Sequence, residues 1–144
     1  MNRFMLDTNM ASYVIKGHPP EVRERLVALP IDSIIISVIT QAELLYGLAR
    51  KGHPAALANV IREFLLRVEV LPWDEHAATV YGDLRASCAS AGITLGALDM
   101  MIAAHAVAAN ATLITHDKAF TLVPDGALAV DDWTNESVRL SVGR

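Results

Sequence analysis

Four acidic residues stand in local settings that suggest metal chemistry: Asp7, Glu43, Asp99 and Asp117. Asp7 directly follows the apolar run Phe4-Met5-Leu6, and Asp117 follows Leu113-Ile114 at a short distance. Short apolar runs are typical of buried strands, and ligands bind at the carboxyl ends of strands in open parallel sheets. Two carboxylates about 4 Å apart there repel by about 4 kcal/mol at an effective dielectric of about 20. They persist together by holding protons or a cation. Mg²⁺ or Mn²⁺ is the simplest cation for an all-oxygen site.

Each acid also has a purely structural explanation. Asp7 and Asp117 lie where a helix cap or a turn favours an acid. Thr40-Gln41-Ala42-Glu43 matches a capping box, in which Glu43 would bond to the backbone N–H of Thr40. Asp99 would lie near the start of an apolar helix, where the helix dipole favours an acid, but Leu98 and the residues after it predict little solvent-facing surface. A buried acid needs a partner, so we interpret the four acids jointly as one pocket.

The elements that would position these acids alternate along the chain. We expect strands at 3–6, 34–36, 68–71, 112–115 and 127–130, and helices at about 9–16, 21–29, 40–51, 54–67, 74–91 and 96–110. This alternation predicts an α/β fold with a central, mostly parallel sheet and helices on both faces. The length of 144 residues predicts a single domain, 1–144, with a polar tail from about residue 134 that is loosely held.

The composition excludes several classes of protein. A net charge of −4 and a pI near 5.7 do not indicate a general nucleic-acid-binding surface, so any such binding depends on local clustering of the 12 basic residues. One cysteine cannot form an internal disulfide, and no apolar run approaches the roughly 20 residues that span a bilayer. We therefore expect a cytoplasmic protein without membrane contact. Candidate residues for holding a substrate are Lys16, Arg23, Arg25, Arg85 and Lys118.

Other catalytic motifs are missing from the sequence. It has no glycine-rich dinucleotide or phosphate loop and no Gly-x-Ser-x-Gly elbow. No pair of histidines stands at metal-ligand spacing. We expect His105 to be a satisfied residue of the core or of a helix surface, whereas His116, beside Asp117, could contact a substrate.

Four motifs occur in order along the chain. They are Phe4-Met5-Leu6-Asp7-Thr8-Asn9, Ser37-x-x-Thr40-x-x-Glu43-Leu44-x-Tyr46-Gly47, Asp99-Met100-Met101-Ile102-Ala103-Ala104-His105-Ala106 and Thr115-His116-Asp117-x-x-Phe120. Together they resemble the acidic motifs of PIN-domain nucleases and, more narrowly, those of the VapC toxins of bacterial toxin–antitoxin pairs. The similarity extends from residue 3 to about residue 133, where Val130-Asp131-Asp132-Trp133 resembles the usual ending.

This resemblance implies an RNase-H-like α/β/α sandwich and a ribonuclease that depends on Mg²⁺ or Mn²⁺. By position, the four acids form the pocket, Asp7 and Asp99 bind the metal directly, and the supporting polar residues are Thr8, Asn9 and Thr115. The implied partners are a VapB-type antitoxin, an RNA substrate such as tRNA or another structured RNA, and a second copy of the chain in a homodimer. The homodimer and the antitoxin would form a hetero-oligomer that contacts DNA only through the antitoxin. Many members carry a further acid where this chain has Ala119, which argues against a second metal held fully by the protein.

Two further expectations concern alternatives and association. A receiver-like signalling module could also bind Mg²⁺ in an acidic pocket, without nuclease activity. However, Asp7 has no acidic neighbour, and the third strand runs into Leu71-Pro72-Trp73 without the phospho-acceptor aspartate that such modules place there. For the homodimer we expect an exposed apolar patch that contains Leu44, Leu48, Ile61, Phe64 and Leu65.

Overall fold

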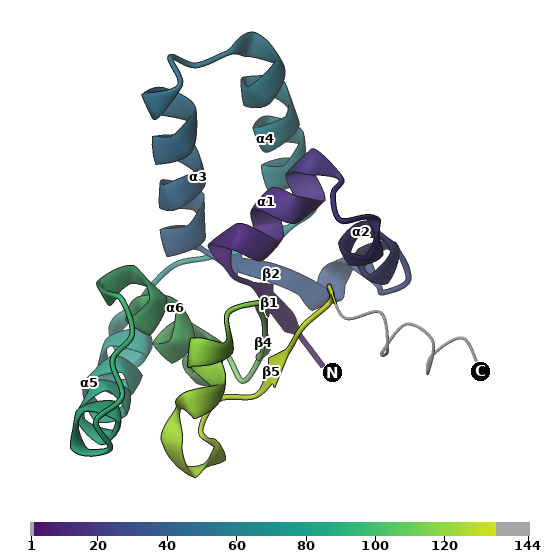
Figure 1. Ribbon diagram of the computed structural model, residues 1–144. Helices are drawn as coiled ribbons and strands as arrows, with labels where there is room; N and C mark the ends of the chain where they lie inside the picture. Colours follow the sequence, from purple (N-terminus) through teal and green to yellow (C-terminus); the bar gives the residue numbers. More distant parts are fainter. Residues whose placement is uncertain (1, 135–144) are drawn as a thin grey trace.

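The structure, a computed structural model, describes residues 2–134 (Figure 1). Five parallel strands form one sheet in the order β3-β2-β1-β4-β5. The strands are β1 (Phe4–Leu6), β2 (Ile34–Ser37), β3 (Glu69–Leu71), β4 (Thr112–Ile114) and β5 (Val130–Asp131). The predicted α/β fold with a parallel sheet is therefore confirmed. The predicted loose tail falls on residues 135–144, which lie outside the described residues.

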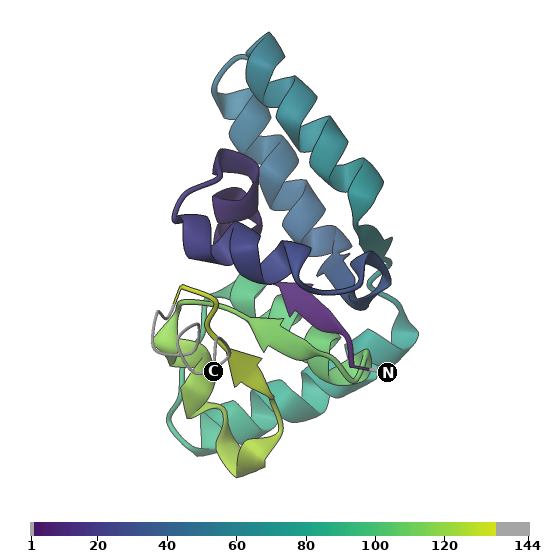
Figure 2. The same ribbon diagram turned by 90° about the vertical axis from the view of Figure 1, so that its right-hand side faces the viewer.

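Helices cover both faces of this sheet because successive strand residues point to opposite sides. Met5, Ile35 and Leu113 pack into one core with α5 (Glu75–Ser90) and α6 (Ala97–Ala108). Leu6, its strand neighbours and the helices of the other face form a second core. Those helices are α1 (Thr8–Lys16), α2 (Pro20–Val27), α3 (Val38–Arg50) and α4 (Ala55–Arg67). The result is the expected three-layer sandwich (Figure 2).

The long helices α3 and α4 run side by side and project away from the sheet (Figures 1 and 2). Four apolar residues that we expected on an exposed patch are buried on this pair, namely Leu44, Leu48, Ile61 and Phe64. That expectation is wrong, because α1 packs against the two helices and covers them. The large apolar side chains that remain exposed on the pair are Val38, Leu45, Tyr46, Val60 and Leu66.

Several element boundaries differ from the sequence-based expectation by one to three residues, and two of these differences have a clear cause. The helix expected from residue 40 begins at Val38, because Ser37 accepts a hydrogen bond from the backbone N–H of Ile39 and caps the helix. The fifth strand begins at Val130 and not at residue 127. The chain approaches it through the 3-10 turns Lys118–Leu122 and Pro124–Gly126, which occupy the residues before it.

Strand β1 lies at the point where the order in which strands are added to the sheet reverses. Its chain continues to β2 on one side, while β4 pairs with it on the other side. Strands β2 and β3 follow on one side of β1, and β4 and β5 are then added on its other side. Such a switch point is where open α/β sheets bind ligands. Asp7 follows β1 and Thr115 follows β4 at this point. Among residues 2–134, no helix has both the length and the apolar character needed to cross a membrane.

Candidate active site

Asp7 is the most deeply placed of the four acids, with 5% of its surface exposed. Its Oδ1 accepts a hydrogen bond of 2.8 Å from the backbone N–H of Met10, so the acid does cap α1 as the structural explanation requires. Burial raises the pKa of Asp7, and the nearby carboxylates of Asp99 and Asp117 raise it further against the lowering effect of hydrogen bonds from Thr115 and Met10. The cap thus leaves a carboxylate whose charge is poorly stabilised.

Thr115 joins the two acids that follow β1 and β4. The residue is buried, and its side chain hydrogen-bonds to Asp7. Its Oγ1 accepts a hydrogen bond of 3.0 Å from the backbone N–H of Asp117. Asp117 is itself exposed, and its Oδ1 accepts from the backbone N–H of Ala119 at 2.9 Å. The predicted convergence of these strand-end residues is therefore present.

Glu43 does not belong to a capping box. Helix α3 begins two residues before Thr40, so Glu43 lies beyond the first turn. Its Oε1 instead accepts a hydrogen bond of 2.6 Å from the Thr8 hydroxyl, which also lies 3.4 Å from the hydroxyl of Thr40. Because this bond joins α3 to the first residue of α1, Glu43 is directed toward the end of β1. The capping-box explanation is wrong.

Asp99 lies in the first turn of α6, after Gly96, and is half-buried. Burial raises its pKa, and the carboxylates of Glu43 and Asp117 raise it further. Its carboxylate takes part in none of the hydrogen bonds and ion pairs of residues 2–134. The helix is more open here than expected, since the side chain of Leu98 is 46% exposed. Asp99 is thus an acid with access to solvent and without a neutralising partner in the described part of the chain.

The four acids lie close enough for their negative charges to influence one another. Within residues 2–134, none of them pairs with a lysine, arginine or histidine. No three acidic, histidine or cysteine side chains of the described chain stand close enough to enclose a metal by themselves. Mg²⁺ fits this arrangement, because it takes one or two carboxylates and retains several waters. Asn9, which we grouped with the supporting residues, is exposed and has no contact with the acids among the described interactions.

Comparison with known proteins identifies the family. The PIN domain profile matches residues 4–126 of the chain. The tRNA(fMet)-specific endonuclease VapC of Shigella flexneri is 38% identical over 135 residues, which cover 93% of this chain and 100% of that protein. The chain is a PIN-domain protein of the VapC ribonuclease family. This membership confirms the predicted fold and ribonuclease function and sets aside the receiver-like alternative.

Solved structures of VapBC complexes share the fold of this VapC-family chain. The DNA-bound VapBC of Salmonella typhimurium superposes with a TM-score of 0.84 at 36% identity, covering 92% of this chain and 99% of that chain. VapBC2 of Rickettsia felis, bound to a DNA fragment from its promoter, gives a TM-score of 0.83 at 33% identity, with 90% and 98% covered. The likeness therefore extends over nearly the whole of each toxin chain.

One polar pair near the site was not foreseen from the sequence. His105 is buried, as expected, and its Nδ1 lies 2.7 Å from the Oγ of Ser37, the residue that caps α3. This contact joins α6, which carries Asp99, to the start of α3, which carries Glu43. No local sequence signal connects two residues 68 positions apart. Both residues belong to the motifs that resemble the family, Ser37 to the second and His105 to the third.

The candidate substrate-holding residues differ in whether they already have partners within the chain. Arg23 donates to the carbonyl of Val14, Arg25 pairs with Asp131 and lies over the Trp133 ring, and Arg85 donates to the Tyr81 hydroxyl. These three arginines already have partners within the chain. His116 pairs with Asp132. Lys16 of α1 lines a small cleft that Thr8 and Glu43 also line, and Lys118 is exposed and follows Asp117 in the sequence.

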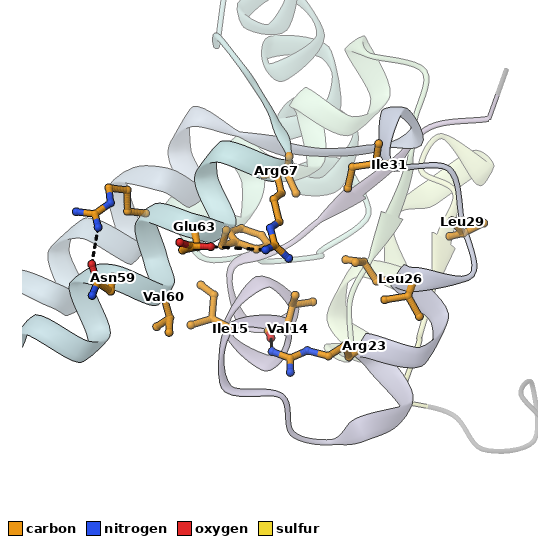
Figure 3. Close-up of a pocket in the computed structure, with 14 residues that line it drawn as sticks. Val14, Ile15, Arg23, Leu26, Leu29, Ile31, Asn59, Val60, Glu63 and Arg67 are labelled. Atoms are coloured by element: carbon orange, nitrogen blue, oxygen red, sulfur yellow. Dashed lines mark hydrogen bonds and ion pairs between the residues drawn. The ribbon is translucent and has the colours of Figure 1, made fainter.

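A larger groove lies away from the acids (Figure 3). It has a volume of about 850 Å³ and lies between α1, α2, α4 and the segment from Leu29 to Ile31. Apolar side chains such as Val14, Leu26 and Val60 line it, and arginines stand at its margin. None of the four acids contributes to this groove, so it offers no catalytic group and suits a binding role.

Proposed function

We propose that this VapC-family ribonuclease hydrolyses RNA phosphodiester bonds at the pocket of Asp7, Glu43, Asp99 and Asp117, with Mg²⁺ or Mn²⁺ as its cofactor. The observation that carries the proposal is the pair Asp7 and Asp99, which come from different elements and both have a raised pKa. A carboxylate whose pKa is raised by burial and by neighbouring carboxylates is stabilised in its charged form when a cation binds beside it. Asp7 and Asp99 would hold the ion directly. When bound, such an ion activates water and stabilises charge on the phosphate.

The remaining residues orient the pocket. The Thr8 hydroxyl holds Glu43 and the Thr115 side chain holds Asp7, so both acids have fixed positions before substrate binds. Glu43 and Asp117 are more exposed than Asp7. From there they would orient metal-bound waters through hydrogen bonds, a role that outer ligands commonly have at metal sites.

The proposed substrate is tRNA or another structured RNA in the cytoplasm. Support comes from the Shigella flexneri relative, which is named as specific for tRNA(fMet). Purified protein should cleave bulk tRNA in Mg²⁺ or Mn²⁺ and lose this activity in EDTA. Because metal-activated water is the nucleophile, the products should carry a 5′-phosphate and a 3′-hydroxyl. A 2′,3′-cyclic phosphate would contradict the mechanism, since it requires attack by the ribose hydroxyl.

The proposed partner is a VapB-type antitoxin, through which a toxin–antitoxin hetero-oligomer contacts DNA. The solved VapBC structures, two of them DNA-bound, support this. The apolar groove would receive a helical segment of the antitoxin by its apolar face. A basic continuation of that segment could then reach the acids, where an arginine pairs with a carboxylate through two hydrogen bonds.

A pair of variants tests the position of the antitoxin. Val60→Asp places a charge in the groove, whereas Leu122→Asp changes a side chain that is 61% exposed outside it. Co-purification with the product of the adjacent upstream gene should be lost for Val60→Asp and kept for Leu122→Asp. Equal retention by both variants would place the antitoxin elsewhere.

A homodimer is proposed for the toxin itself. The exposed apolar side chains Leu45, Tyr46 and Leu66 on α3 and α4 supply a surface for it, outside the antitoxin groove and in place of the buried residues that we first expected there. Sedimentation should give twice the chain mass of 15.6 kDa. A species of that single mass at micromolar concentration would rule the dimer out.

A further inference from the structure

A cleft of about 130 Å³ lies between α1, α3 and α4, and Glu43 is the member of the four acids that lines it. Thr8, Ser12 and Lys16 line it from α1 at intervals of four, and Glu43 and Gly47 of α3 and Lys51 just after α3 line it at the same intervals. The other lining residues are apolar and come from α1, α3 and α4: Ile15, Leu44, Leu48, Leu57 and Ile61. Residues at intervals of four lie on one face of a helix. The polar lining residues therefore form one row on α1 and one along α3, and both rows begin near the ends of strands β1 and β2.

The charge of the cleft changes along its length. At the inner end the Thr8 hydroxyl is bonded to Glu43, and at the outer end two lysines, Lys16 and Lys51, contribute to the lining. The two levels are about 12 Å apart, since eight helical residues rise by that distance. Neither lysine takes part in an ion pair within residues 2–134. Two ammonium groups on one cleft repel each other unless an anion lies between them.

The middle of the cleft is open. Gly47 has ordinary helical geometry, and a Cβ added there would meet no atom within 4 Å. A larger side chain at this position would project into free space between the two walls. Together with the hydroxyl of Ser12, the bare backbone offers room for a chain that extends from the acids toward the lysines.

A simpler explanation of the lysines is that they complement helix dipoles. Lys16 is in the last turn of α1, and Lys51 follows the end of α3, where cations are favoured. Arg50, in the last turn of α3, satisfies the same dipole and does not line the cleft. The dipole therefore explains a cation at each helix end, but it does not explain why the two lysines share one cleft with Glu43.

We propose that the α1–α3 cleft binds the RNA strand next to the cleavage point, with Lys16 and Lys51 holding a backbone phosphate. This inference rests on the proposed nuclease function and adds a subsite to it. A phosphate in this place would fix how the strand enters the pocket. The two lysines would also supply local positive charge in a protein whose net charge of −4 otherwise repels RNA.

Binding measured without cleavage tests the subsite. In an Asp99→Asn background, the affinity for a fluorescein-labelled single-stranded RNA oligonucleotide is followed by anisotropy over a series of KCl concentrations. Each lysine-to-alanine change, Lys16→Ala or Lys51→Ala, should weaken binding by roughly fivefold and lower the slope of log K against log salt by about 0.7. Arg50→Ala is the matched control and should leave both the affinity and the slope nearly unchanged. Equal effects of all three changes would indicate a diffuse charge effect and overturn the subsite.

A steric variant gives an independent measurement. Gly47→Leu should obstruct the cleft and weaken RNA binding, whereas Gly82→Leu, at a helical glycine of α5 that is equally open, should not. Thermal unfolding checks that both variants are folded. Unchanged RNA binding by Gly47→Leu and by the lysine variants would refute the proposal, and so would normal RNA binding with loss of antitoxin binding. Failure of wild-type protein to cleave RNA would instead refute the proposed function while leaving the binding result interpretable.

Discussion

Two groups of aspartates stand at the same edge of the sheet and differ in what neutralises them. Asp131 and Asp132, at the end of β5, have partners from their own chain: Arg25 lies 3.3 Å from Asp131, and the His116 ring lies 2.8 Å from Asp132. Partial burial alone would raise the pKa of Asp132, but hydrogen bonds from Thr134 and His116 lower it on balance.

Asp7 and Asp99 are the opposite case. Burial raises the pKa of both, other carboxylates raise it further, and no ion pair within residues 2–134 offsets this. The two groups thus consist of the same residue type at the same edge of the sheet. They differ in whether a group within the chain compensates their negative charge. A carboxylate whose counter-charge is built into the chain is structural. For the four acids of the proposed site, in contrast, we propose that the counter-charge is a cation that comes from outside.

The largest expected effect separates the two groups by activity. Asp7→Asn or Asp99→Asn keeps the side-chain shape and removes the charge, so RNA cleavage in Mg²⁺ should fall by on the order of a hundredfold or more. Asparagine is also a good helix cap, so Asp7→Asn retains the cap on α1. Asp132→Asn is the matched control at the other group and should keep most of the activity. Comparable losses for all three variants would mean that the distinction is wrong.

The next effect is stabilisation by metal. At a free Mg²⁺ concentration tenfold above its Kd, binding to the native state alone adds about 1.4 kcal/mol to the free energy of unfolding. For a domain of this size that raises the Tm by roughly 5 °C. Wild type and Asp132→Asn should show the increase in differential scanning fluorimetry, whereas Asp99→Asn should show little of it. An equal rise in Asp99→Asn would mean that the ion binds elsewhere.

A smaller effect is the pH dependence of the metal-free protein. The folded-state pKa of Asp99 is above the ordinary value of 3.8, so the folded protein binds this proton more tightly than the unfolded chain does. Stability from Asp99 is therefore greatest in acid and is lost as the pH rises from about 3.8 through the raised pKa. In EDTA, Asp99→Asn should gain stability relative to wild type as the pH rises from 4 to 7. Urea unfolding measures the difference, and a constant difference across this range would contradict it.

The sequence could predict the parts of the site that follow from strand order. Asp7 and Thr115 come directly after apolar runs, and a parallel sheet brings such positions to one edge. Local rules failed where tertiary contacts decide. The Thr40–Glu43 spacing matches a capping box, yet Ser37 caps the helix and Thr8 binds the glutamate. The Lys16–Lys51 cleft depends on how α1 and α3 are rotated about their axes, which no segment encodes alone.

A third polar group on this edge, the Ser37–His105 pair, extends the comparison to a buried group satisfied without any ion. Ser37 Oγ accepts from the backbone N–H of Ile39, so its hydroxyl proton is directed to His105 Nδ1. A hydrogen bond between His105 and the backbone of Pro72 also stabilises the ring. Burial lowers the pKa of His105, although Asp74 and the bond to Pro72 oppose this. The neutral ring with its proton on Nε2 satisfies both contacts.

The smallest predicted effect concerns the titration of this histidine. Because its folded-state pKa is below the ordinary value of 6.5, the unfolded chain binds the proton more tightly. Stability is therefore lost as the pH falls below about 6.5, until the folded form also becomes protonated. His105→Asn can still accept from Ser37 but does not titrate. It should be less stable than wild type near pH 7.5 by roughly 1–3 kcal/mol, because the Pro72 contact is lost.

That deficit should shrink as the pH is lowered to about 5.5, since only the wild type carries the titrating ring. The other histidines and Asp74 are common to both proteins, so their titration cancels in the difference. Urea unfolding at several pH values measures it. A deficit that stays constant with pH would mean that His105 has the same pKa in the folded and unfolded states. The Ser37–His105 pair would then not be an example of a buried group that is satisfied only in its neutral form. A deficit that shrinks, with activity largely retained, would show that this edge of the sheet carries a neutral polar pair as well as the acids. What distinguishes the proposed catalytic acids would then be a negative charge without a cationic partner, and not polarity alone.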